Sequence, residues 1–176
     1  AAPAVTATQA SKFMIGIGLA CYGQSNMNAM LGYWTNATPA ANTDTMFFDG
    51  TNWIVPPSAD GLRYLLNIIN TVSGVPCFAT NGGQAGVSIN TLSKGDATGY
   101  YTAFMAKVQA MRGAEFFLWR HGESAAAGFG QNQTEYTAAF NTLHADVAAD
   151  TGRTKAQIPA IVSTLACNPG ATTGSN

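Results

Sequence analysis

Three short segments of the sequence hold residues that could carry out acyl chemistry. In Gly23-Gln24-Ser25-Asn26-Met27, a serine lies among small and polar residues, where a tight turn that opens a helix would expose its hydroxyl as a nucleophile and leave its backbone N–H free to donate. Segment 81–86 (NGGQAG) is glycine-rich and suited to presenting backbone N–H groups to an anion. His121-Gly122-Glu123 supplies an imidazole and a carboxylate. The lipase-type motif G-x-S-x-G is not matched, because Met27 follows Asn26.

Each of these segments follows a short apolar run that predicts a buried β-strand. The predicted strands are Phe13 to Ala20, Val75 to Thr80, Glu115 to Arg120 and Ile158 to Leu165. Alternation of such strands with helical periodicity predicts an α/β domain with a mainly parallel sheet. Ligands of such sheets bind in loops at the carboxyl ends of the strands, which is where the three segments lie.

Helices are predicted between these strands. The first helix has an apolar face of Leu62, Leu65, Leu66 and Ile69, with Ser58 or Asp60 as cap and Gly74 at its end. The second has an apolar face of Tyr101, Phe104, Met105 and Val108. The third starts near Thr134, ends at Gly152, and has an apolar face of Tyr136, Phe140, Leu143 and Val147. Residues 46–55 predict a small hairpin around Asp49-Gly50-Thr51, which we expect to decorate the core sheet rather than belong to it. A sheet that stops on a strand has no helix to cover that strand's second face, which indicates a missing element.

Composition narrows the classes of partner. The chain has 176 residues, of which 47% are hydrophobic and only 10% charged, with 8 basic and 9 acidic side chains. One domain with a sizeable core and an uncharged polar surface is expected. Without a basic cluster, the charge pattern argues against nucleic acid and anionic membranes as partners, and no apolar run approaches the ~20 residues of a membrane-spanning helix.

The three segments resemble blocks of the SGNH hydrolase superfamily, and more narrowly of its sialate O-acetylesterase and acetylxylan-esterase-like branch. GQSNM after the first strand, Gly86-Val87-Ser88-Ile89 (G-x-S-I) after the second and Trp119 to Glu123 (W-x-x-G-E) after the third occur in the order of that branch. The resemblance implies a three-layer α/β/α, flavodoxin-like sandwich. It also implies a hydrolase that removes acyl groups, typically acetyl, from carbohydrate hydroxyls without metal or cofactor.

The resemblance also implies roles for individual residues. Ser25 would be the nucleophile, and the oxyanion hole would combine its own backbone N–H with that of Gly86, or of Gly83 as a fallback, and a side-chain donor from the third block. Gln24, Asn26 and Glu123 would support the loops.

Two departures from the branch bear on catalysis. His121 stands where the branch usually has Gln, so it could be an oxyanion donor, a loop support or a substitute base. The branch also carries Asp-x-x-His near its C-terminus as general base and orienting carboxylate, and this chain has no such motif. His144, at the edge of an apolar helix stripe, is expected to be structural.

The missing base leaves two explanations open. The base lies on a second chain or on a C-terminal segment outside these residues, so that the domain is truncated before its last strand and helix, or the protein is a degenerate carbohydrate-binding or structural module. We expect residues 1–12 to be a linker or processed N-terminus, 13–167 an esterase domain that is incomplete at its C-terminus, and 168–176 a flexible tail or a cleavage or truncation end.

The remaining residues of interest give weaker expectations. Cys21, Cys77 and Cys167 are expected to be buried free thiols, and no Cys/His spacing suggests a metal site. Four aromatic residues are as suited to stacking on sugar rings as to internal packing; they are Tyr22, Tyr33, Trp34 and Trp53. The uncharged surface and sugar-ester chemistry favour an extracellular, secreted or virion- or cell-surface setting.

Overall fold

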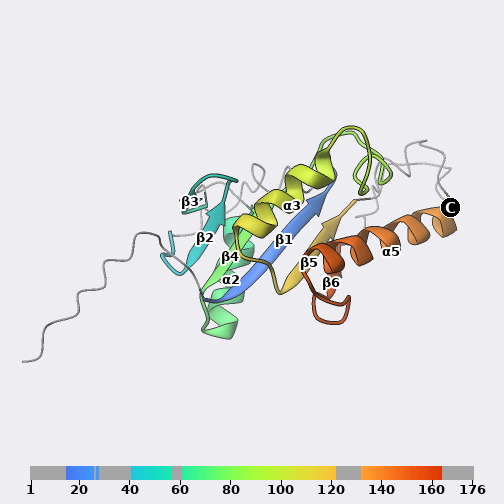
Figure 1. Cartoon of the computed structure of the whole chain (residues 1–176). Coiled ribbons are helices and arrows are strands. Elements are labelled where there is room, and N and C mark those ends of the chain that lie inside the picture. The colour runs from blue at the N-terminus through green and yellow to red at the C-terminus, as the bar shows by residue number, and fades with distance from the viewer. Residues whose placement is uncertain (1–14, 26, 28–40, 57–60, 122–131, 164–176) are drawn as a thin grey trace, which may run out of the picture.

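A six-stranded sheet organises the protein. The computed structural model describes residues 15–25, 27, 41–56, 61–121 and 132–163. The strands are β1 (Ile17–Gly23), β2 (Thr45–Phe48), β3 (Trp53–Ile54), β4 (Cys77–Asn81), β5 (Phe116–Arg120) and β6 (Ala160–Val162), in the order β3-β2-β4-β1-β5-β6 (Figure 1). All neighbours are parallel except β2 and β3. This confirms the predicted α/β class and its mainly parallel sheet.

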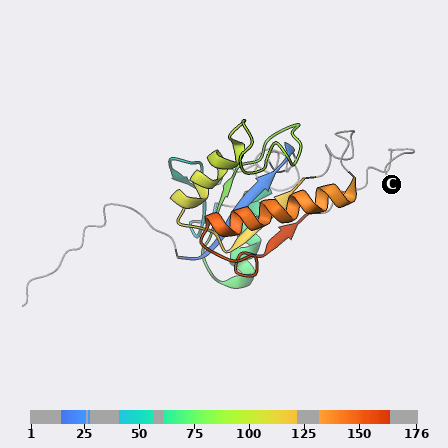
Figure 2. The same cartoon turned by 45° about the vertical axis from the view of Figure 1, so that its right-hand side comes forward.

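Helices cover both faces of the sheet. Helices α3 (Tyr100–Ala110) and α5 (Gln133–Asp150) lie side by side over one face, and α2 (Gly61–Ser73) lies behind the other (Figures 1 and 2). The first face buries the larger aromatic core, which includes Tyr22, Phe117 and Trp119. The second buries Leu19, Cys21 and Leu118 beneath α2. Successive residues of β1 and β5 therefore enter opposite layers, as in a flavodoxin-like sandwich.

The strand positions differ from prediction by a few residues. β1 begins at Ile17 and runs to Gly23, because Cys21 still pairs with β4 and the residues from Cys21 to Gly23 pair with β5 instead of turning away after Ala20. β4 begins at Cys77 instead of Val75, since Pro76 has no N–H to donate to a neighbouring strand. The predicted strand 158–165 contains β6, and residues 13, 14, 164 and 165 lie outside the described part of the chain.

The hairpin was wrongly predicted to decorate the core sheet. β2 pairs in parallel with β4 and forms part of the sheet, while β3 alone is the outer antiparallel arm. Phe47 enters the α2 layer and Phe48 the opposite layer, so β2 is buried on both faces like a central strand. The turn itself is confirmed, with the Asp49 carboxylate accepting hydrogen bonds from the N–H groups of Thr51 and Asn52 at 2.7 Å each.

Helix ends are set by side chains close to the predicted ones. α5 begins at Gln133, close to the predicted start near Thr134, and Asn132 caps it. The Asn132 Oδ1 accepts from the Glu135 N–H at 3.0 Å, and the Glu135 carboxylate accepts from the Asn132 N–H at 3.1 Å. Gly74, with φ of 66°, follows α2, and Gly152, with φ of 70°, follows α5, as predicted. The predicted caps Ser58 and Asp60 lie outside the described residues.

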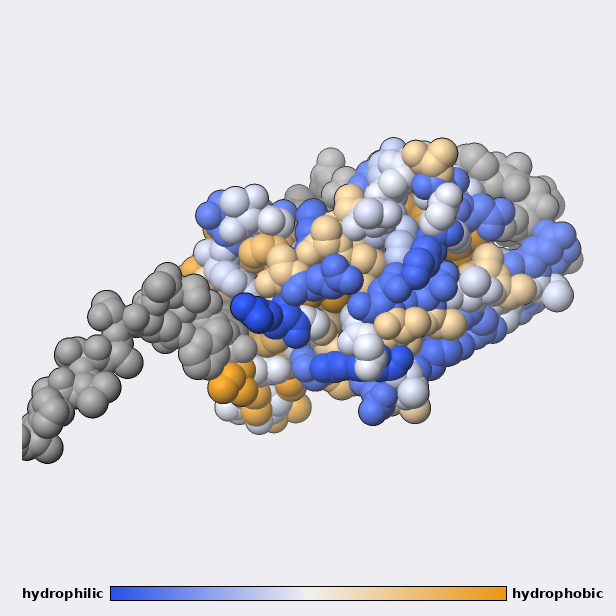
Figure 3. Space-filling model, viewed as in Figure 1, coloured by the Kyte–Doolittle hydropathy of each residue, from blue (hydrophilic) through white to orange (hydrophobic). Residues whose placement is uncertain are grey.

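The surface shown in Figure 3 mixes polar and pale side chains without one dominant apolar area. An orange patch lies at the lower end of α2 in that view. Among the exposed apolar side chains are Val72 (82% exposed), in the last turn of α2, and Val75, which follows the helix. Within the described residues, no helix is long and apolar enough to cross a membrane. Cys21 and Cys77 are buried free thiols, as predicted, and Cys167 lies outside the described part.

Replacing the α5 cap tests this account of the fold. Asn132→Ala should lower the free energy of unfolding by about 1 kcal/mol, because the Glu135 N–H loses the side-chain oxygen that accepts its hydrogen bond. Asn132→Asp is the matched control, since a carboxylate caps as well and suits the positive end of the helix. Urea unfolding of both variants measures the difference. Equal stabilities of the alanine variant and the wild type would contradict the role of the cap.

Candidate functional site

The centre of the sheet has the topology at which open parallel sheets bind ligands. β1 lies between β4 and β5 in the sheet. After β4, the chain continues through α3 and crosses to β5 on the other side of β1. In open parallel sheets, such a switch point is where ligands bind, at the carboxyl ends of the strands. The segments that contain Ser25, Gly83 and His121 directly follow β1, β4 and β5. The fold therefore brings the three predicted segments to one edge.

A tight turn positions Ser25. Gly23 has φ of 149°, and a Cβ atom there would lie 2.0 Å from the Arg120 carbonyl oxygen, so only glycine fits. The next residue, Gln24, is buried and its N–H donates to the same carbonyl at 2.9 Å. Ser25 and Met27 then have helical backbone conformation, and the Ser25 side chain is half-buried. In a first helical turn, the backbone N–H of Ser25 has no acceptor within the helix and can bind a ligand.

Three N–H groups of the glycine-rich loop after β4 donate to acceptors within the protein. The N–H of Gly82 donates to the Cys21 carbonyl at 2.9 Å and that of Gln84 to the Gly23 carbonyl at 3.0 Å. The Gly83 N–H, the fallback oxyanion donor, donates to Asn81 Oδ1 at 2.6 Å. These donors are used to bind the loop to β1 and to itself, so they are not available to an anion in this structure.

Gly86 is placed differently. It is exposed, has φ of 68°, and a Cβ atom there would have no neighbour within 4 Å. No residue of the described chain accepts a hydrogen bond from the Gly86 N–H. Of the two backbone donors predicted from this loop, Gly86 is therefore the one with an N–H open to a ligand.

Asn81, the last residue of β4, connects the loops of the site. Its Nδ2 donates to the Met27 carbonyl at 2.9 Å, its Oδ1 accepts from Gly83, and its own carbonyl accepts from Lys107 Nζ at 3.0 Å. The side chain is 5% exposed. In the sequence, Asn81 stands out only as the first residue of a glycine-rich segment. Its position at the end of a buried strand, where a polar side chain needs partners, was the signal for a structural role.

His121 is held in a buried chain of hydrogen bonds. The indole N–H of Trp119 donates to the Tyr136 hydroxyl at 3.0 Å, this hydroxyl lies 3.2 Å from His121 Nδ1, and Nε2 lies 3.0 Å from the Val87 carbonyl. An indole only donates and a carbonyl only accepts. Tyr136 therefore donates to Nδ1, and the neutral His121 carries its proton on Nε2 and donates it to Val87.

This arrangement bears on the roles predicted for His121. Its N–H is used by Val87 and its lone pair by Tyr136, so it offers neither an oxyanion donor nor a base while these bonds hold. Its ring also stacks on Trp119, with centroids 5.2 Å apart. Burial lowers the pKa of His121, which keeps it neutral. The geometry favours loop support. Asn26, Gly122 and Glu123 lie outside the described residues.

The other histidine and the aromatic residues have packing roles. His144 is buried, its Nε2 lies 2.8 Å from the Ile158 carbonyl, and its ring stacks near Phe117, which agrees with the structural role predicted for it. Tyr22 is fully buried and stacks on Phe104 at 4.2 Å, while Trp53 packs beside Phe48 and Phe78. Packing thus accounts for Tyr22 and Trp53, and Tyr33 and Trp34 lie outside the described part.

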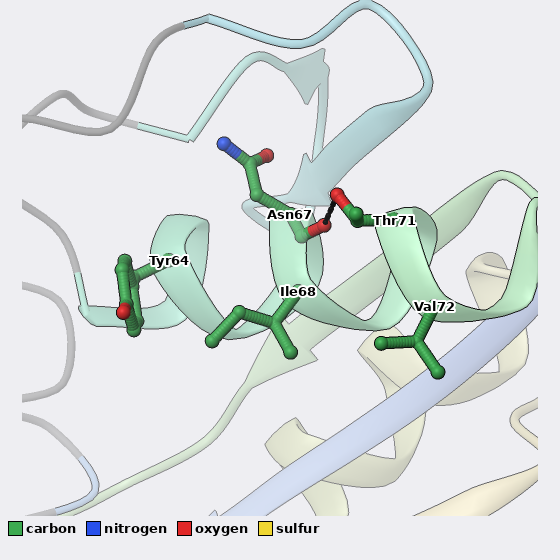
Figure 4. Close-up of a pocket in the computed structure, with 5 residues that line it drawn as sticks. All are labelled: Tyr64, Asn67, Ile68, Thr71 and Val72. Atoms are coloured by element: carbon green, nitrogen blue, oxygen red, sulfur yellow. Dashed lines mark hydrogen bonds between the residues drawn. The ribbon is translucent and has the colours of Figure 1, made fainter.

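Two hollows differ in chemistry and place. One, of about 370 Å³, adjoins the loop after β4 and is lined by Phe47, Asp49, Asn81, Gly82, Gly83, Gln84 and Lys107. The other, of about 210 Å³, runs along α2, where Figure 4 shows Tyr64, Ile68 and Val72 in a row. The second is mainly apolar, and the dashed bond from Thr71 to the Asn67 carbonyl is internal to the helix. Of the two, the first lies at the loop that follows β4. Among the described residues, no group of three His, Cys, Asp or Glu could hold a metal ion.

Comparison with solved structures supports this fold. A protein from Arabidopsis thaliana has a TM-score of 0.65 at 14% identity, over 84% of this chain and 74% of that one. A carbohydrate acetylesterase from Xanthomonas citri has a TM-score of 0.64 at 16% identity, over 84% of this chain. This chain spans 40% of the length of the Xanthomonas protein. No family model and no curated protein matches the sequence. At such identities, the likeness shows the shared fold.

Removing the Asn81 side chain should destabilise the site and the fold together. Asn81→Ala leaves the buried Met27 carbonyl and Gly83 N–H without partners, so we expect a loss of about 2 to 4 kcal/mol in unfolding free energy. Asn141→Ala, which removes one exposed bond to Lys155, should change it by less than about 0.5 kcal/mol. Urea unfolding compares the two. Similar small losses in both variants would contradict the connecting role of Asn81.

His121 should make the stability of the protein depend on pH. Its folded pKa lies below the ordinary value of about 6.5, so the unfolded chain binds the proton more readily. The contribution of neutral His121 to the free energy of unfolding is therefore fully present above about pH 6.5, and it is lost as the pH falls through that value toward the folded pKa.

The expected result is a larger fall in melting temperature between about pH 7.5 and 5 for the wild type than for His121→Gln. Glutamine can donate to Val87 and accept from Tyr136 without titrating. His121→Leu, which can do neither, should melt lower at both pH values. Identical pH dependence of the wild type and the glutamine variant would contradict this description.

Proposed function

We propose that this protein is a serine esterase of the SGNH type that removes O-acetyl groups from carbohydrate. The observation that carries the proposal is the turn after β1, which places Ser25 in a first helical turn at the switch point of the sheet. The GQSNM block and the two later blocks, in the order of that branch, support it. So does the fold shared with the carbohydrate acetylesterase from Xanthomonas citri.

In the proposed reaction, Ser25 Oγ attacks the acetyl carbonyl carbon and gives its proton to a general base. The backbone N–H groups of Ser25 and Gly86 stabilise the oxyanion of the tetrahedral intermediate. The intermediate collapses when the C–O bond to the sugar breaks, and the sugar oxygen takes the proton. Water then hydrolyses the acetyl-serine by the same steps, releasing acetate and restoring the Ser25 hydroxyl.

His121 acts as a positioning residue in this proposal. It holds the carbonyl of Val87, whose neighbour Gly86 provides the oxyanion donor. Tyr136 and Trp119 fix the tautomer that makes this possible. Gln24 anchors the turn before Ser25 through its backbone bond to Arg120, and Asn26 and Glu123 keep the supporting roles that the resemblance implies.

The general base is proposed to come from outside these 176 residues. The sequence contains two histidines, and both have hydrogen-bond partners in the core. An Asp-x-x-His segment on a second chain or on a further part of the same protein would supply an imidazole and its orienting carboxylate. The substrate setting is proposed to be extracellular, on a secreted or surface-associated glycan.

A second candidate function follows from the same engaged histidines. A module that kept the fold and lost the base would bind carbohydrate, or serve a structural role, without cleaving it. The two candidates differ in one measurable property, the reactivity of the Ser25 hydroxyl.

Substitution of the nucleophile tests the proposed function. In the protein as isolated from its source, Ser25→Ala should reduce hydrolysis of 4-nitrophenyl acetate by at least about a thousandfold, because the acetyl-serine cannot form. Ser93→Ala is the control, since its hydroxyl donates only to the Ile89 carbonyl. Unchanged hydrolysis in the Ser25 variant would overturn the esterase proposal, and no hydrolysis by the wild type would favour the non-catalytic module.

A further inference from the structure

We infer that the 370 Å³ hollow beside the Ser25 turn is a subsite for a neutral sugar ring, in which Lys107 and Asp49 recognise the ring hydroxyls. This inference rests on the proposed function, because it names the part of the substrate that lies next to the reacting ester. The volume falls in the range of about 300 to 1,000 Å³ that small-molecule sites occupy.

The subsite adjoins Ser25 through bonded backbone. Its lining residue Gln84 donates to the Gly23 carbonyl at 3.0 Å, and its lining residue Asn81 donates to the Met27 carbonyl at 2.9 Å. Gly23 and Met27 stand two positions before and after Ser25. A ring bound in the hollow therefore lies next to the turn that carries the nucleophile.

Lys107 lines this hollow, and its ammonium group is held by the backbone carbonyl of another lining residue. It extends from α3 across the turn after β2, where its Cε would lie 3.3 Å from a Cβ atom at Gly50, and its Nζ donates to the Asn81 carbonyl at 3.0 Å. An ammonium has three N–H donors, of which Asn81 takes one. The helix α3 thus brings a fixed hydrogen-bond donor to the carboxyl ends of β2 and β4.

Asp49 supplies the matching acceptor and sets the charge of the hollow. Its Oδ1 accepts the two N–H groups of its own turn, and these bonds, with a smaller effect of the Lys107 charge, lower its pKa. A carboxylate and an ammonium in one hollow balance each other and offer an acceptor and a donor to neighbouring hydroxyls. Because the two charges offset each other, the hollow offers an acidic sugar no net attraction, so the chemistry favours a neutral ring.

Binding of a partially acetylated xylo-oligosaccharide tests the subsite apart from catalysis. In ¹H–¹⁵N spectra of the wild type, this ligand should shift the amide signals of Asp49, Gly82 and Gln84. Lys107→Met, which keeps the side-chain stem over Gly50, should weaken binding by about tenfold or more through loss of charged hydrogen bonds. Lys155→Met is the control, since Lys155 precedes β6 at the opposite edge of the sheet and donates to Asn141.

The outcomes separate this inference from the proposed function. Shifts confined to other residues, or equal affinity of the wild type and Lys107→Met, would overturn the subsite even if Ser25-dependent hydrolysis is found. Weaker binding by Lys107→Met without any hydrolysis would support the subsite and refute the esterase. Tighter binding of an O-acetylated sialic acid than of the xylo-oligosaccharide, lost in Lys107→Met, would overturn the neutral-ring assignment.

Discussion

The site depends on how the carboxyl end of β1 is held between its neighbours. Three backbone hydrogen bonds cross this point, from Gly82 to Cys21, from Gln84 to Gly23 and from Gln24 to Arg120. The Arg120 carbonyl lies so close to Gly23 that no side chain fits there. The chain must therefore turn at Gly23, and Ser25 begins a helix at the centre of the edge. The position of the proposed nucleophile follows from strand packing alone.

Buried polar groups then fix the loops around this turn. Asn81 binds both the segment after Ser25 and its own loop, and the chain from Trp119 through Tyr136 to His121 ends on Val87. Such groups are costly to bury and specify one arrangement only when each has a partner. Helix α5 takes part because it carries Tyr136, which links a helix on the face of the sheet to the proposed oxyanion donor at its edge.

Sequence patterns predicted the layers and the edge that holds the site, because apolar runs and helical stripes depend on local burial. They did not predict that β2 lies inside the sheet, since a four-residue strand and a hairpin arm have the same short pattern. Nor did they predict the use of the N–H groups of Gly82 and Gly83, which is decided by distant partners. The role of His121 was left open for the same reason: its partners Val87 and Tyr136 come from other segments.

The most direct test of the account is mass spectrometry of the protein as isolated, after treatment with a fluorophosphonate that reacts only with activated serines. The account predicts one adduct per chain, located by peptide mapping on Ser25 and absent from the Ser25→Ala variant. It also predicts that the labelled preparation contains a polypeptide or segment with Asp-x-x-His beyond these 176 residues. An unlabelled Ser25, under conditions that label a known serine esterase completely, would contradict the central claim and leave a carbohydrate-binding module.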